Sequence, residues 1–517
     1  MHGIMCASVS VMRVPYSCVF KSGKLQAYLR HAVYQADSQH TLISQLASCL
    51  AMTTRRFSIH LKPHQPQDRK SLLKLRCSPR SVRHTAIQSK NGSDGLSPAA
   101  WTEPFKLPEP QLDWSYLLDK KNTETIAANI YNRKGIGDIH KLITLSELYA
   151  QEQNAEKKEA LRQEMTSEAL DIPNISHPET IVGDESCARQ VEVVGDKKDF
   201  DFKPRPVSEL GGKGLKMLRD RNLTFSTGTK TYYLEADLAQ LERALVNFTL
   251  DFLQTKGFEY VTVPDVLHSG VIDSCGFKTS LAKSQVYHLH PDCLKGACLA
   301  GTAEMSLAGY FMNEVVPMDH LPARITAASR CYRAEATEKA VEKGLYRVHH
   351  FTKVEMFGLS ADEDGTESNE LLHDFLDIER ELFSLLGLHF RILDMPSQEL
   401  GAPAHRKYDV ESWMYGKQIW GEISSCSNCT DYQSRRLKIK YARPDGSLRH
   451  VHTVNGTACA VPRMIISILE QNQSKGRRLE LPEVLHPYMD GQTHLQFDVK
   501  NASYTYIKTL RDTSTGS

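Results

Sequence analysis

Two neighbouring stretches of the chain decide its fold: Arg330-Cys-Tyr-Arg-Ala-Glu335 and Gly344-Leu-Tyr-Arg-Val-His-His-Phe-Thr-Lys-Val-Glu355. Both lie in segments rich in β-branched and aromatic residues, which predicts strands over Ile325–Glu335 and Leu345–Phe357. The polar, charged segment Ala336–Gly344 would join them as a loop. Two strands joined in this way form an antiparallel hairpin.

The hairpin would place complementary side chains on one face of a sheet. Because side chains alternate along a strand, Arg333 and Glu335 share one face, as do Phe351, Lys353 and Glu355. A guanidinium binds phosphate, an aromatic ring can stack on a base, and a carboxylate can receive an ammonium group. Each residue alone could equally belong to an exposed face with ordinary ion pairs. Together they suit an amino acid bound beside a nucleotide.

The surrounding sequence predicts an α+β domain with an antiparallel sheet, because the predicted strands are more numerous than strict β-α-β alternation would give. Further strands are expected over Phe258–Val263, Phe390–Leu393, Ile419–Ser424 and Arg449–Val454. Helices are expected over Glu235–Lys256, Glu367–Leu386 and Ala460–Gln473. Neither a GxxxxGK[ST] nor a GxGxxG loop occurs, so ATP would have to be bound without one.

Longer segments resemble the seryl-tRNA synthetases, a family of class II aminoacyl-tRNA synthetases. The hairpin resembles their motif 2, Asn455-Gly-Thr-Ala-Cys-Ala-Val-Pro-Arg463 resembles motif 3, and Gly257-Phe-Glu-Tyr-Val-Thr-Val-Pro264 resembles motif 1. Thr302-Ala-Glu304 and Glu422-Ile-Ser-Ser-Cys-Ser-Asn-Cys-Thr-Asp-Tyr-Gln-Ser-Arg-Arg436 narrow the match to seryl enzymes. The resemblance implies a class II antiparallel sheet flanked by helices, with an N-terminal helical tRNA-binding arm.

The resemblance also implies a reaction and a set of site residues. The chain would activate L-serine with ATP and Mg²⁺, and then transfer the serine to mitochondrial tRNA(Ser). Serine would be bound by Thr302, Ala303, Glu304, Glu355, Asn455 and Thr457. ATP would be bound by Arg333, Ala334, Glu335, Val348, Phe351, Glu422, Ile423, Ser424, Ser425 and Arg463. Arg333, Glu422 and Arg463 would be the catalytic residues, and Glu422 and Ser425 the Mg²⁺ ligands.

The same resemblance implies a homodimer, and together with the composition of the N-terminus it predicts four regions. Motif 1 helices of the family pair across a two-fold axis, and the apolar face of Glu235–Lys256 is expected to serve this pairing. The expected regions are a presequence and linker (1–100), a helical tRNA-binding region (101–198), a class II catalytic domain (199–489) and a tail (490–517).

The first ninety residues are basic and almost free of acids. Asp37 and Asp68 are the only acidic residues before position 91, among many Arg, Lys and Ser residues. This composition is typical of a mitochondrial transit peptide, and it favours a location in the mitochondrial matrix. A basic arm that contacts nucleic acid is the alternative. No apolar run is long enough to predict a membrane span.

The helical arm is expected to be short. Only about 36 residues separate Gly135 from Asp171, which at about 1.5 Å per residue allows a short hairpin or a single helix. This leaves open a synthetase paralogue that binds serine, ATP or tRNA without charging.

Cys426 and Cys429 form a CxxC pair, but a structural zinc site needs four ligands, so no zinc is expected.

Overall fold

The computed structural model describes residues 106–221, 223, 226–281, 284–335, 344–476 and 478–496. The presequence and linker expected over 1–100, the hairpin loop at 336–343 and most of the tail expected over 490–517 lie outside the described residues. Among the helices that the structure describes, none combines the length and apolar character needed to cross a membrane.

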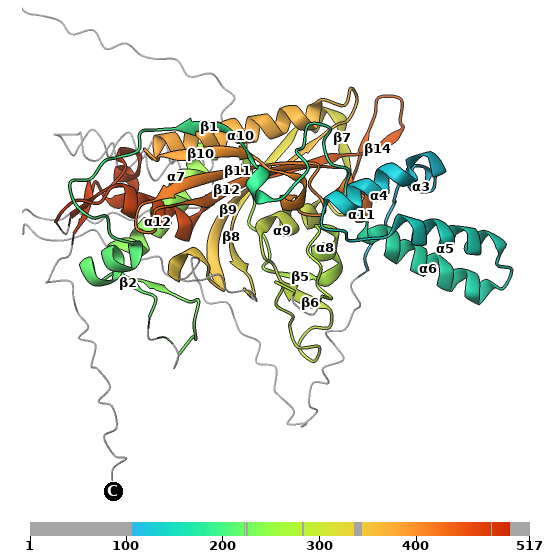
Figure 1. Cartoon of the computed structure of the whole chain (residues 1–517), viewed down its shortest axis with the longest axis horizontal. Helices are drawn as coiled ribbons and strands as arrows, with labels where there is room; N and C mark the ends of the chain where they lie inside the picture. Colours follow the sequence, from blue (N-terminus) through green and yellow to red (C-terminus); the bar gives the residue numbers. More distant parts are fainter. Residues whose placement is uncertain are drawn as a thin grey trace, which may run out of the picture. The chain divides into compact units, whose positions relative to one another are not determined.

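An eight-stranded sheet forms the centre of the described chain (Figure 1). Its order is β1-β10-β11-β12-β15-β9-β8-β4, and every pair except β4–β8 is antiparallel. The strands are β1 (Arg189–Val194), β4 (Glu259–Tyr260), β8 (Ala323–Tyr332), β9 (His350–Ser360), β10 (Phe390–Asp394), β11 (Arg406–Met414), β12 (Ile419–Thr430) and β15 (His452–Ala460). The α+β prediction with an antiparallel sheet is therefore confirmed.

The predicted hairpin is present, with shorter strands than expected. β8 and β9 pair from Ala323↔Leu359 to Tyr332↔His350. β8 ends before Arg333, and Glu335 takes a left-handed conformation with φ of 47°. Residues Gly344–Tyr346 form a 3-10 turn, η7, rather than the start of β9. Phe351, Lys353 and Glu355 therefore share one face of β9 as predicted, whereas Arg333 and Glu335 follow the end of β8 and do not share a strand face.

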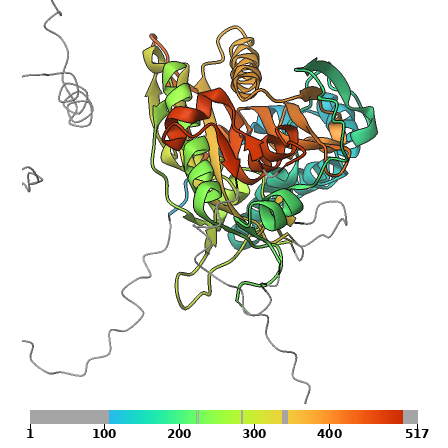
Figure 2. The ribbon, with the colours of Figure 1, turned by 90° about the vertical axis from the view of Figure 1, so that its left-hand side faces the viewer.

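Three helices pack on one face of the sheet: α7 (Ala236–Thr255), α10 (Glu367–Leu385) and α12 (Val461–Gln471). They share one core with Val354 and Met356 of β9, so Lys353 and Glu355 point to the opposite face. Figure 2 shows α7 and α12 beside one another, as their contacts require. The apolar face of α7 is buried in this core, with Leu241 and Leu245 fully covered, so the expectation that this face is free for dimer formation was wrong.

A second core supports the opposite face of the sheet. It joins α8 (Ser269–Ser274), α9 (Ala303–Tyr310) and α11 (Tyr432–Leu437) to β8 and β9. Short ribbons complete the fold: β2 (Leu218–Arg219) with β3 (Tyr233–Leu234), β5 (Val266–His268) with β6 (Ala297–Leu299), β7 (Val315–Pro317) with β13 (Lys440–Ala442) and β14 (Leu448–His450), and β16 (Arg478–Glu480) with β17 (His494–Gln496).

The N-terminal region is helical, with α3 (Trp114–Leu117), α4 (Thr123–Asn132), α5 (Ile139–Gln151) and α6 (Ala155–Asp171). Asp138 and Asn154 cap α5 and α6 by accepting backbone N–H groups. The two helices lie side by side as a hairpin over a small core that includes Leu142 and Met165 (Figure 1). With 17 residues, α6 is about 25 Å long, so the hairpin is short.

Candidate active site

A pocket opens on the face of the sheet that carries Lys353. Its walls come from the end of β8, η7, β9, β12 and the start of α12. The residues that line it are Arg333, Glu335, Leu345, Tyr346, Arg347, Val348, Phe351, Lys353, Glu422, Ile423, Ser424, Ser425, Thr457, Ala460, Pro462 and Arg463. Nine of the ten residues expected at ATP are in this set. Ala334 instead donates its backbone N–H to the Gln285 carbonyl at 2.8 Å.

Two arginines define the cationic side of the pocket. The Arg463 guanidinium lies 3.1 Å from the Glu422 carboxylate, donates to the Glu422 carbonyl at 3.0 Å, and stacks over Tyr346 at 4.5 Å from the ring centroid. Arg333 donates to the Gly301 carbonyl at 3.3 Å and lies 5.5 Å from the centroid of Phe351. Both guanidiniums are thus held by carbonyls and rings, and they face a volume that an anion can enter.

The Glu422 carboxylate is ionised although protein surrounds it. Loss of water around it would raise its pKa, but Arg463 and then Lys407 outweigh this effect and hold the pKa at about 2. Its side chain is still 41% exposed toward the pocket. A charged, accessible carboxylate beside a guanidinium can bind a metal ion while the guanidinium binds phosphate.

Glu335 is oriented by two cations that the sequence motifs did not single out. Arg347 lies 3.2 Å from its carboxylate, and Lys230 donates to its carbonyl at 2.6 Å. Arg347 occurs inside the quoted hairpin segment, so its charge could have been noticed there. Lys230 precedes β3 and lies 105 residues away in the chain, and no local pattern links it to Glu335.

The residues expected to bind serine are more buried than those expected to bind ATP phosphates. Lys353 forms an ion pair with Glu355, and both side chains are almost fully buried. The Thr457 hydroxyl donates to Glu355 at 3.3 Å and accepts from Lys353 at 3.2 Å. Glu355 is therefore already paired with a cation of the protein, which the resemblance had not indicated.

Glu304 is a second buried carboxylate in this region. It lies in the first turn of α9, where its N–H donates to Thr302 Oγ1 at 3.3 Å, and the neighbouring Ala303 is fully buried. Gln433 and Asn455 donate to its two carboxylate oxygens at 2.6 Å and 3.3 Å. Burial and then the charge of Glu355 raise the pKa of Glu304 to about 7.

The expected Mg²⁺ ligands, Glu422 and Ser425, both line the pocket from β12. Across the ladder, Glu411 is opposite Glu422 and Asp409 is opposite Ser425. Mg²⁺ prefers oxygen ligands and is commonly bound by one or two carboxylates together with substrate phosphates. The residues fit such an ion. Within the described ranges, no group of three or more His, Cys, Asp or Glu side chains is arranged for a metal, and Cys426 and Cys429 are buried free thiols.

Residues 287–472 match the family model "tRNA synthetase class II core domain (G, H, P, S and T)". The mitochondrial serine–tRNA ligase of Mus musculus is 49% identical over 346 residues, 67% of this chain and 65% of that protein. The serine–tRNA ligase of Rubrobacter xylanophilus is 39% identical over 336 residues, 65% of this chain and 78% of that protein. The chain belongs to the serine–tRNA ligase family. It spans about two thirds of the mitochondrial relatives it matches, 65% of the mouse and 66% of the Bos taurus protein.

Solved structures of serine–tRNA ligases share the fold. The seryl-tRNA synthetase of Pyrococcus horikoshii, complexed with ATP, superposes with a TM-score of 0.68 at 26% identity, covering 75% of this chain and 100% of that chain. The cytoplasmic serine–tRNA ligase of Naegleria fowleri, in complex with AMP, gives a TM-score of 0.66 at 26% identity. The class II sheet flanked by helices is thus confirmed as the fold.

Proposed function

We propose that the chain is a serine–tRNA ligase that activates L-serine with ATP and transfers it to mitochondrial tRNA(Ser). The observation that carries this proposal is the convergence of Arg333, Arg463 and Glu422 at one pocket, which Lys353 and Thr457 of the Lys353–Glu355–Thr457 cluster also line. Phosphate-binding cations and an amino-acid-sized polar cluster thereby meet on one sheet face. ATP is named for the Pyrococcus horikoshii relative, and serine and tRNA for the family.

In the proposed activation step, the serine carboxylate attacks the α-phosphorus of ATP, and pyrophosphate leaves. Arg333 and Arg463 bind the phosphates and offset the charge that grows on them, so the protein acts by positioning and electrostatics. Phe351 offers its ring to the adenine base. Mg²⁺, when bound at Glu422 and Ser425, would supply further charge compensation for the phosphates. A terminal ribose hydroxyl of tRNA then attacks the adenylate carbonyl, and AMP leaves.

Serine selection follows from the buried polar cluster. Glu355 receives the substrate ammonium, and Thr457 contacts the small polar substrate beside it. The ammonium replaces the cation that Lys353 supplies to Glu355 in the free protein. A site that hydrogen-bonds a hydroxyl rejects an analogue without one, because its own buried polar groups are then left unpaired. Alanine should therefore be a poor substrate.

Serine-dependent ATP–pyrophosphate exchange with Mg²⁺ tests the activation step. Wild-type chain should exchange with serine and not with alanine. Arg463→Ala should lose at least about a hundredfold in rate, because a buried phosphate would lose a charge-assisted bidentate partner. The exposed Arg478, which pairs with Glu480 on β16, supplies the matched control Arg478→Ala. Equal exchange in wild type and Arg463→Ala would sink the assignment.

The transfer step rests on a different surface. Residues 139–171, which form the short α5–α6 hairpin, contain four Lys or Arg side chains and seven Asp or Glu side chains. Two of the four cations are paired there, Lys141 with Glu168 at 2.8 Å and Arg162 with Glu159 at 2.9 Å. The hairpin is therefore acidic overall, which does not favour an RNA backbone. A cluster of exposed basic side chains precedes α7: Lys213, Lys216, Arg219, which lies 6.0 Å from the centroid of Tyr233, and Arg221, which lies 3.9 Å from Asp220. We propose that this basic segment contributes to tRNA binding.

A paralogue that activates serine without charging tRNA remains the second candidate, and the short hairpin favours it. Adding tRNA(Ser) to the exchange assay and measuring seryl-tRNA separates the two. Charging at a rate comparable to activation would exclude the paralogue. Lengthening the hairpin between Gly135 and Asp171 should then improve the apparent KM for tRNA without changing exchange.

Three further proposals concern the whole protein. A homodimer would pair through the motif 1 segment, where β4 ends the sheet and Tyr260 is 42% exposed; sedimentation at micromolar concentration tests it. Import into the mitochondrial matrix is supported by the composition of residues 1–90, and by the mitochondrial relatives. A chain without residues 1–90 should stay in the cytosol. Limited proteolysis should cut near the proposed boundaries at 100, 198 and 489.

A further inference from the structure

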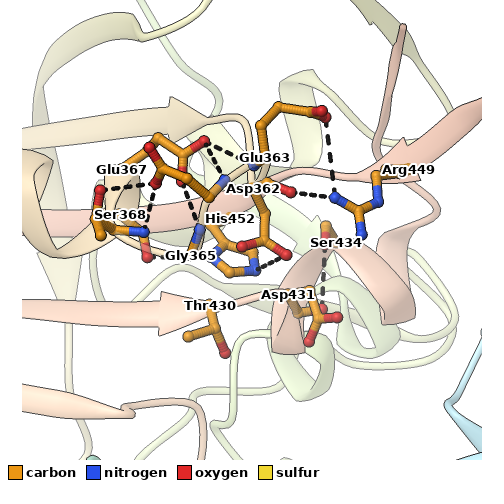
Figure 3. Close-up of polar contacts among 12 residues, drawn as sticks. Asp362, Glu363, Gly365, Glu367, Ser368, Thr430, Asp431, Ser434, Arg449 and His452 are labelled. Carbon is orange, nitrogen blue, oxygen red and sulfur yellow. Dashed lines mark hydrogen bonds and ion pairs between the residues drawn. The ribbon is translucent and has the colours of Figure 1, made fainter.

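Helix α11 (Tyr432–Leu437) lies between the proposed serine site and the N-terminal helices. It follows directly from β12, and Figure 3 shows the polar contacts at this junction. Ser434 donates to the Asp431 carbonyl at 3.1 Å, and His452 of the neighbouring β15 contacts Ser368 at 3.0 Å. At the end of β12, Asn428 donates to the Ser368 hydroxyl at 3.0 Å and Thr430 pairs with Thr453, so the junction is anchored to β15 and to the first turn of α10.

The outer side of α11 is fixed by the N-terminal region. The buried Arg436 donates to the Leu170 carbonyl at the end of α6 at 3.3 Å, and its guanidinium lies 3.3 Å from the centroid of Tyr432. Arg435 contacts Asp113 at 3.2 Å and accepts the Gln111 N–H at 2.7 Å through its carbonyl. A short helix held at both sides is a rigid platform for the side chains it carries.

The inner side of α11 carries Gln433, which is completely buried. Its amide nitrogen donates to Glu304 Oε1 at 2.6 Å, and its amide oxygen accepts from the Thr453 hydroxyl at 2.7 Å. The Thr453 bond fixes which end of the amide faces the carboxylate. Asn455 serves the other carboxylate oxygen at 3.3 Å. Both oxygens of Glu304 are thus oriented by neutral donors, and the carboxylate plane is set.

We propose that Gln433 is a positioning residue of the serine site, holding the Glu304 carboxylate in one fixed orientation toward the substrate, beside the Glu355 side chain that receives the ammonium. The inference rests on the proposed function and adds to it a residue from outside the pocket lining. A neutral donor suits this task, because a cation here would pair with Glu304 and compete with the substrate. Gln433 supplies a hydrogen bond without supplying a charge.

The charged surroundings explain why a donor matters at this carboxylate. Glu304 faces Glu355 and Lys353 from β9, Arg333 from the end of β8, and the buried thiols of Cys275 and Cys429. Burial and then Glu355 raise the pKa of Glu304, while the Gln433 hydrogen bond is the first influence that lowers it. Removing the donor should therefore move the carboxyl further toward its neutral form near pH 7.

The test is Gln433→Met, a substitution of similar size without a donor. At pH 7 the serine KM in pyrophosphate exchange should rise about tenfold, the loss of one charge-assisted hydrogen bond, while the ATP KM changes less than about twofold. The increase should shrink as the pH is raised to 8.5, since Glu304 then ionises without help. Buried Gln471, which donates to Ser412 at 2.7 Å and lies at the last residue of α12 on the helix-covered face of the sheet, gives the matched control Gln471→Met.

The outcomes separate this inference from the proposed function. Absence of serine-dependent exchange in the wild type would overturn the proposed function itself. If the wild type is active, either of two results in Gln433→Met would overturn the role of Gln433. One is an unchanged serine KM, and the other is an equal rise of the serine KM and the ATP KM at every pH. If Gln433→Met fails to fold, Thr453→Val removes only the orienting hydroxyl. It should raise the serine KM about threefold with the same pH dependence, and no change would also overturn the role.

Discussion

Replacing Glu304 with glutamine removes an ionisable group that burial holds in an unfavourable environment. Burial and then Glu355 raise its pKa from 4.5 to about 7. Below pH 4.5 the carboxyl is neutral in both the folded and the unfolded chain. As the pH rises toward 7, the unfolded chain ionises first and is stabilised, so the wild type loses stability through this range. Above pH 7 the loss stays constant.

The magnitude follows from the two pKa values. One pKa unit corresponds to about 1.4 kcal/mol, so the wild type should be penalised by about 3 kcal/mol at pH 8 and by about 1 kcal/mol at pH 5. Glutamine has no charge to desolvate, and its amide can still bond to Gln433. Glu304→Gln should therefore be more stable than wild type at pH 8, by up to this amount, while its serine KM rises.

Urea unfolding followed by tryptophan fluorescence measures the difference at both pH values. The ring centroids of Trp413 and Trp420 lie 5.2 Å apart on neighbouring strands of the sheet, so their fluorescence follows the unfolding of the sheet. Glu379→Gln is the matched control, because burial also raises the pKa of Glu379 well above its ordinary value, yet this residue lies in α10 on the other face of the sheet. The control should gain stability at pH 8 and keep its serine KM. A stability difference for Glu304→Gln that is the same at pH 5 and pH 8 would refute the reasoning.

Lys353→Met leaves the buried Glu355 without its cation and should lower the free energy of unfolding by about 3–5 kcal/mol; adding Glu355→Gln should restore most of the urea midpoint. Glu422→Gln removes a carboxylate whose pKa is held at about 2, so it should destabilise the protein at pH 7 and progressively less as the pH falls from 4.5 toward 2, as urea midpoints across the range from pH 7 down to about pH 2 would show. Replacing Lys213, Lys216, Arg219 and Arg221 with Gln should raise the tRNA KM about tenfold, and make its dependence on salt shallower, while pyrophosphate exchange is unchanged.

Local pattern predicted much of the fold because its strongest elements carry their own periodicity. The helix expected over Glu235–Lys256 is α7 at Ala236–Thr255, and the helix expected over Glu367–Leu386 is α10 at Glu367–Leu385. Strand ends were less predictable. β8 ends near Tyr332 because Arg333 makes one more bond in register, to His349, and Ala334 then donates to the Gln285 carbonyl instead of pairing across the hairpin. One expected strand over Arg449–Val454 is split into β14 and β15, which belong to different sheets.

The residues of the candidate site could be predicted only where they belong to sequence motifs of a known family. Nine of the ten residues expected at ATP line one pocket, because the motifs specify which side chains are present. The internal partners of these residues come from distant segments. Gln433 lies 129 positions from Glu304, and Lys230 lies 105 positions from Glu335. Long-range register sets such contacts, and a periodicity within one segment carries no information about them.

These internal partners bear on how the site would bind its substrates. Arg463 is paired with Glu422, and Lys353 is paired with Glu355. In each pair, the two charged groups that the substrates would contact neutralise one another in the free protein. At the buried Lys353–Glu355 pair, an unpaired charge would cost several kcal/mol, which the pairing avoids in the free protein. A phosphate that approaches Arg463 would release Glu422 toward a metal ion, and an ammonium that approaches Glu355 would release Lys353 toward the substrate carboxylate or phosphate. Binding would then exchange one set of ion pairs for another, so affinity would be modest for each substrate alone. When a pair opens, it frees one cation and one anion. ATP with Mg²⁺ would satisfy both members of the Arg463–Glu422 pair, and zwitterionic serine would satisfy both members of the Lys353–Glu355 pair. A ligand with a single charge would leave one member of a pair without a partner.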